Sequence, residues 1–135
     1  MAMQPIAITT NTTIDRDTHI DTVVRINRAG GLTVTLPAST GSGDVYRFYV
    51  QTTLTASATI AAAGSDLMQG AVIVSTTNTA GTGSSSATSV KLVMNGSTTG
   101  GIIGSYVEVR DVVSGVWQAT GALVASGSFA TPFSA

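Results

Sequence analysis

The sequence contains no cysteine, so it can hold neither a disulfide framework nor a thiolate metal site. Aromatic residues are also scarce, at 5% of 135 residues, which leaves small aliphatic side chains to build a core. A chain of this length makes about one domain. Stability must therefore come from the packing of small side chains and from assembly with other subunits.

Charge is the second scarcity, because charged residues make up 10% of the chain against about 25% in an average soluble domain. The six Lys and Arg residues are scattered and form no cluster, so we expect no nucleic-acid partner. Thr, Ser, Gly and Ala replace charge, most clearly over residues 76–86. Such a neutral surface does not oppose self-association, and we expect much of it to contact other protein. An ordinary monomer is the alternative.

Long apolar runs are absent too, since no stretch approaches the roughly 20 apolar residues that span a bilayer. The low charge also argues against binding to anionic membrane surfaces, so no membrane partner is expected. The segment Met1 to Pro5 lacks the basic region and apolar core of a signal peptide. These features predict a protein that is made and kept in the cytoplasm of the cell that produces it.

What is present is a series of short β-branched and aromatic runs separated by Gly, Ser, Asn and Pro, which is typical of all-β proteins. We expect an antiparallel β-sandwich or a barrel-like single domain. The expected strands are residues 6–10, 22–27, 32–36, 45–51, 58–62, 71–76, 89–94, 105–112, 116–120 and 123–126.

Glycine positions predict the connections between these strands. Ala29-Gly30-Gly31 and Ser114-Gly115 are typical of tight hairpin turns, and Asn95-Gly96 of a turn between strands. Residues 61–70 favour a short helical turn capped by Ser65 or Asp66. The Gly- and Ser-rich segment 80–87 is predicted to be a mobile loop.

The N-terminal segment, residues 1–21, alternates apolar residues with Thr and has no obvious partner strand. One interpretation is an extended arm that adds to a neighbouring subunit's sheet, with Ile6, Ile8 and Ile14 as contact residues and residues 22–135 as the β domain. The other interpretation is a first strand of the domain itself.

Catalytic groups are few. His19 is the one histidine, no Gly-x-Ser-x-Gly elbow exists, and no glycine-rich run ends in a phosphate-binding Lys. We therefore expect no enzyme, no catalytic residues and no cofactor. Asp15, Asp17 and His19 would share one face of a strand and suggest a metal site, but the pattern fails as a calcium loop. The alternative is a solvated charged turn in which Arg16 offsets the acids.

Residues 32–50, from Leu32 through Tyr46 to Val50, resemble a segment of small tailed-bacteriophage virion proteins. Residues 58–70 and 115–121 extend the resemblance to roughly residues 30–125. The chain is similar in size to capsid decoration, or cement, proteins, which bind the expanded head, commonly as trimers. The resemblance implies a protein on the capsid exterior of the virion, with copies of itself and the major capsid protein as partners.

We therefore expect a virion structural protein that binds the outside of a phage head and stabilises it, with the N-terminal arm among its capsid contacts. The alternative is a tail or head-fibre domain that binds host-surface carbohydrate. In that case a platform of exposed rings is expected, drawn from Tyr46, Tyr49, Tyr106 and Trp117. Trp117, the one Trp, also fits a simpler role as a core anchor.

Overall fold

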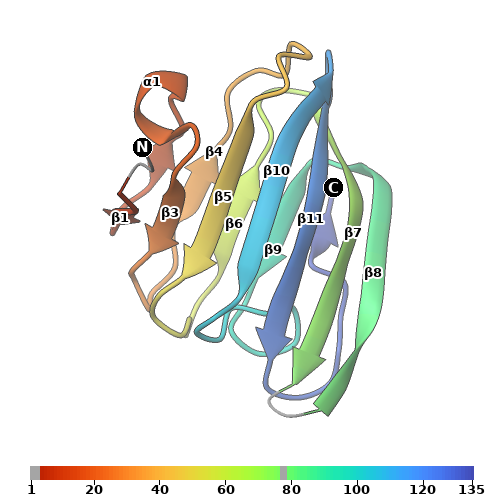
Figure 1. Cartoon of the computed structure of the whole chain (residues 1–135). Helices are drawn as coiled ribbons and strands as arrows, with labels where there is room; N and C mark the ends of the chain where they lie inside the picture. The colour runs from red at the N-terminus through yellow and green to blue at the C-terminus, as the bar shows by residue number, and fades with distance from the viewer. Residues whose placement is uncertain (1–3, 77–78) are drawn as a thin grey trace.

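A computed structural model describes residues 4–76 and 79–135 and shows a sandwich of two β-sheets (Figure 1). The all-β prediction is confirmed. The larger sheet has the strand order β1-β3-β5-β10-β11-β7-β8, and the smaller sheet has the order β12-β9-β6-β4-β2. The elements are β1 (Ile6–Ile8), β2 (Thr12–Thr13), α1 (Arg16–His19), β3 (Val23–Ile26), β4 (Thr33–Thr35), β5 (Val45–Val50), β6 (Ala58–Ala61), β7 (Leu67–Thr76), β8 (Thr79–Ser89), β9 (Lys91–Met94), β10 (Tyr106–Val113), β11 (Val116–Ala125) and β12 (Phe133–Ser134).

The first six strands alternate between the two sheets, so that β1, β3 and β5 enter the larger sheet and β2, β4 and β6 the smaller one. Because the chain crosses to the other sheet after each strand, successive strands within one sheet run in the same direction. The pairs β1–β3, β3–β5, β2–β4 and β4–β6 are accordingly parallel, and so is β7–β11. The sheets are therefore mixed, where antiparallel pairing was expected.

This alternation also changes the role of the glycine turns. Ala29-Gly30-Gly31 links β3 of one sheet to β4 of the other, so the predicted hairpin there is wrong. Ser114-Gly115 does close a hairpin, because β10 and β11 pair antiparallel up to Val113 and Val116. Asn95 begins the turn after β9, where its side-chain oxygen accepts hydrogen bonds from three following backbone N–H groups.

The core lies between the two sheets and follows the period-two alternation of the strands. In β5, Tyr46, Phe48 and Val50 are buried at 1% exposure each, while the residues between them are half-buried. Trp117 is also 1% exposed, which confirms it as a core anchor. Leu36, at the end of the alternating run that contains β4, is buried as well.

Two other local predictions are wrong. The segment predicted as a mobile loop forms most of β8, which pairs with β7 across the larger sheet. Small residues have weak strand preference of their own, and the neighbouring strand supplies the hydrogen bonds that order them. Residues 61–70 contain a turn closed by the Asp66 N–H on the Ala63 carbonyl, followed by strand, and no helix.

Residues 4–21 of the N-terminal segment lie in the same sandwich. β1 pairs with β3 and β2 pairs with β4, while Ile8 and Ile14 are buried at 7% and 3% exposure and Ile6 is half-buried. In the single chain Ile8 and Ile14 belong to the chain's own core. Whether the segment acts as an arm toward a neighbouring subunit or a capsid subunit stays a prediction.

Candidate functional site

A buried carboxylate organises the end of the sandwich where β10 and the loop 37–44 meet. Asp111 is 2% exposed and lies where the β10–β11 register shifts. Its oxygens accept hydrogen bonds from the Ser39 hydroxyl (2.7 Å), the Gly41 N–H (2.8 Å), the Ser42 hydroxyl (2.9 Å) and the Thr40 N–H (3.0 Å). The carboxylate thus fixes a loop that is distant in the sequence.

These donors control the ionisation of Asp111. Burial by itself raises the pKa of the carboxyl group, but the Thr40 and Gly41 N–H groups and the Ser39 and Ser42 hydroxyls outweigh it. The pKa of Asp111 therefore lies well below its usual range, and the group is a carboxylate in the folded protein. Because its lone pairs are occupied by these donors, the carboxylate has little capacity to act as a general base or a metal ligand.

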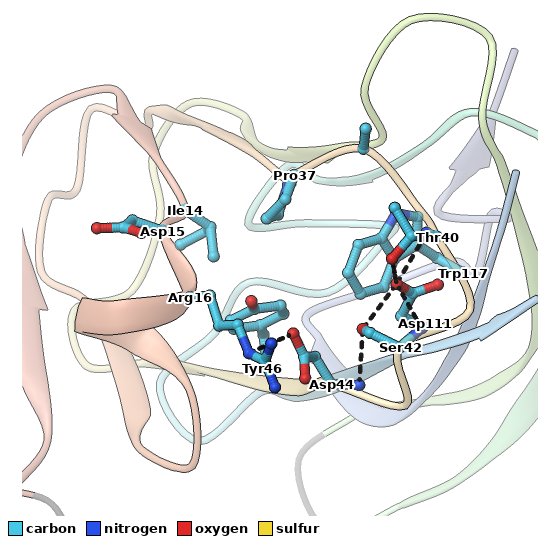
Figure 2. A pocket seen from close by; sticks show the side chains of 11 residues that line it. Ile14, Asp15, Arg16, Pro37, Thr40, Ser42, Asp44, Tyr46, Asp111 and Trp117 are labelled. Atoms are coloured by element: carbon cyan, nitrogen blue, oxygen red, sulfur yellow. Dashed lines mark hydrogen bonds and ion pairs between the residues drawn. The ribbon is translucent and has the colours of Figure 1, made fainter. Parts of the chain in front are cut away.

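We call Asp111 and its donor residues Ser39, Thr40, Gly41 and Ser42 the Asp111 clamp. A cavity of about 360 Å³ lies beside this clamp (Figure 2). Its apolar side is formed by Tyr46 and Trp117 together with aliphatic residues, and its polar side by hydroxyls and charged groups. Arg16 reaches across to Asp44, with 3.1 Å between Nε and Oδ2. The residues that line it are Ile14, Asp15, Arg16, Pro37, Ala38, Thr40, Ser42, Asp44, Tyr46, Asp111 and Trp117.

The two aromatic rings at the cavity pack against each other, with centroids 5.8 Å apart and planes inclined at 53°. Burial, with the nearby Asp44 charge, raises the pKa of Tyr46 to about 12. Trp117 Nε1 is buried and has no acceptor among the described residues. Since both side chains are only 1% exposed, neither ring offers a face for sugar stacking. Of the four rings considered for a platform, Tyr49 and Tyr106 are half-buried.

The segment with Asp15, Asp17 and His19 forms the helical turn α1 and its cap, so the expectation of a strand with all three on one face is wrong. Asp15 is the N-cap, and its carboxylate accepts from the Asp17 N–H and the Thr18 hydroxyl, both at 3.2 Å. His19 is 6% exposed, and its Nδ1 lies 2.9 Å from the Asp15 N–H. Arg16 pairs with Asp44 rather than with these acids.

Within residues 4–76 and 79–135, no three His, Asp or Glu side chains are grouped as metal ligands would be. The same part of the chain holds no helix of the length and apolarity that crossing a membrane requires.

Sequence reasoning missed the Asp111 clamp. Its five residues, Ser39, Thr40, Gly41, Ser42 and Asp111, come together only through the fold. The available signals were an acid within a strand-forming run and a loop with many small donors. Neither signal indicates the other.

Comparison of the chain with protein-family models, with curated proteins and with solved structures finds no significant match.

Proposed function

We propose that this chain is a virion structural protein that binds the outer surface of a phage head and stabilises it, without catalysing a reaction. Its partners in this proposal are the major capsid protein and further copies of itself, with a trimer as the expected oligomer. The proposal is supported by the resemblance of residues 30–125 to virion proteins and by one structural feature, the outer edge of β8.

β8 ends the seven-stranded sheet, and among the described residues its one partner strand is β7. Its eleven residues are all Ala, Gly, Ser or Thr. Edge strands that avoid association usually carry Lys, Pro or a covering segment. β8 has no Lys or Pro, and the C-terminal segment contacts it through a side chain, where the Ser84 hydroxyl donates to Thr131 Oγ1 at 2.6 Å. The backbone groups on the outer edge of β8, which pair with no other strand of the described residues, can therefore bind an extended segment of another protein chain.

The neighbouring strand adds an apolar contact to this edge. Ile73 of β7 is 57% exposed, and its partner across the ladder is Gly83 of β8, which has no side chain to cover it. A strand added beside β8 would bring side chains toward Ile73. Backbone hydrogen bonds and one apolar contact make a weak single attachment, which repetition over a symmetric head makes strong.

Replacing Ser85 by lysine is expected to weaken binding to undecorated heads by about tenfold, because a solvated cation in an edge strand opposes strand addition. The measurement is co-sedimentation of purified protein with heads. Ser57→Lys, in an exposed loop, is the matched control and should bind like the parent protein. Failure of the parent protein to co-sediment at any salt concentration would refute the proposed function. Equal binding by both variants would show that β8 is not the attachment edge.

A further inference from the structure

The outer face of the larger sheet carries an unusual share of the chain's positive charge. Arg25 of β3, Arg47 of β5 and Arg110 of β10 are three of the six cationic residues in the sequence. The three strands are adjacent in the sheet, which lies in front of the smaller one in Figure 1. The residues that alternate with these arginines point into the core, so the arginines occupy the outer face.

The register places the three arginines in three successive rows of the sheet, and the row of Arg25 also holds two tyrosines, while Arg110 pairs with Val45 in the third row. Arg25 pairs with Tyr49, which pairs with Tyr106, and in the next row Arg47 pairs with Glu108. Tyr and Arg are the residue types that most often dominate binding energy at protein interfaces. The face is therefore suited in composition, as well as in charge, to contact another protein.

One acid faces these three cations. The Glu108 carboxylate lies 3.3 Å from Arg47 Nε and 4.0 Å from Arg110 Nη2, and it accepts a hydrogen bond from the Tyr106 hydroxyl at 3.1 Å. Arg25 donates to the neutral Gln51 side chain, and its Nε has no acceptor among the described residues. This face, which we call the basic face (Arg25, Arg47, Tyr49, Tyr106, Glu108 and Arg110), has a net charge of +2.

The complementary charge lies in the same chain, around α1. Asp15, Asp17 and Asp21 are exposed, and none of them takes part in an ion pair among the described residues. With Arg16, and with His19 neutral, this acidic turn (residues 15–21) has a net charge of −2. The two patches are therefore opposite in sign, and Asp44, which pairs with Arg16, adds negative charge beside the acidic turn.

We propose that the acidic turn of one copy docks on the basic face of a second copy. Two unbalanced cations are too few to neutralise a run of phosphates, but their charge is complementary to that of the acidic turn. The contact joins unlike surfaces, so each copy provides both halves of it. This contact between copies goes beyond attachment to a head and does not require one.

The test is the mass of the purified full chain in solution, measured by light scattering at about 0.02 M and about 1 M salt. The chain should associate at low salt and dissociate at high salt, because exposed charges are screened within about 3 Å at 1 M. Arg110→Glu and Asp17→Arg should each weaken association by about tenfold or more. Arg28→Glu makes the same charge change on an exposed residue outside both patches and should not weaken it.

Mixing the two reversed variants separates charge pairing from general damage. The altered face of the Arg110→Glu variant would meet the altered turn of the Asp17→Arg variant with opposite charges again, so the mixture should regain association that neither variant shows alone. A chain that is monomeric at every salt concentration would overturn the inference, and so would association that survives both reversals. Head binding by a monomeric chain would leave the proposed attachment to heads standing, while this inference and the expected trimer fail.

Discussion

Replacing Asp111 by alanine is expected to lower the free energy of unfolding by about 3 kcal/mol. Hydrogen bonds to a charged group contribute about 1.5–3 kcal/mol each, and the carboxylate accepts several from the loop 37–44. Thr40, Gly41 and Ser42 are exposed, so water can accept some of the hydrogen bonds that the carboxylate no longer accepts. The loss of stability is therefore smaller than the summed contributions of these hydrogen bonds. Urea unfolding followed by circular dichroism measures the change.

Asp111→Asn provides the shape-matched variant, since its amide puts N–H donors against the donors of the loop. It should lose about 2 kcal/mol. Asp17→Asn makes the same chemical change on an exposed side chain and should stay within about 0.5 kcal/mol of the parent protein. An Asp111→Asn protein as stable as the parent would show that the carboxylate does not hold the loop.

Acid should weaken the parent protein more than the Asp111→Asn variant. The pKa of an aspartate in an unfolded chain is about 3.9, whereas the pKa of Asp111 in the folded protein lies well below this value. The unfolded chain therefore takes up the proton first, so the stabilisation is present above about pH 4 and is lost as the pH falls further. Urea midpoints measured from about pH 6 down to about pH 2 should fall more steeply for the parent protein.

Replacing Gly70 by alanine is expected to cost about 3 kcal/mol. Gly70 has a φ of 141°, which L side chains rarely adopt, and a β-carbon there would overlap the backbone carbonyl oxygen of Ala119. Neither backbone can move away without breaking the parallel ladder between β7 and β11. The position also lies where the β7–β8 register shifts, as is common for glycine at a bulge.

Gly83→Ala is the matched control for this prediction. Gly83 lies in the neighbouring strand β8, has no positive φ, and would place its β-carbon in open space. Its stability should change by less than about 0.5 kcal/mol. Thermal unfolding of both variants provides the measurement, and similar midpoints for the two would contradict the steric argument at Gly70.

The parts of the fold that the sequence predicted are those with strong local signals. β5 is rich in aromatic and β-branched residues, and its buried residues alternate strictly with half-buried ones. Trp117 was predicted to anchor the core, and it is buried. Both were placed correctly from residues within a few positions of each other. Most strands were predicted from the same local patterns, but β2, β8 and β12 were not, and neither were the partners of the strands.

The failures involve information held elsewhere in the chain. β8 is ordered by β7 rather than by its own small residues, so its composition suggested a loop. The mixed pairing follows from crossings between sheets, which a list of strands does not specify. The turn α1 was the one failure with a local signal, because Asp15 is a favoured N-cap residue and the following acid suits a first helical turn.

The order of strands in the larger sheet has a consequence for synthesis on the ribosome. β10 and β11 lie between β5 and β7, although both are made after them. The centre of the sheet therefore cannot close until Ala125 has left the exit tunnel. Until then β5 and β7 each present an edge without its final partner, and unpaired edges invite wrong pairing. The nascent chain is most exposed to misassembly in this interval, before its last long hairpin inserts.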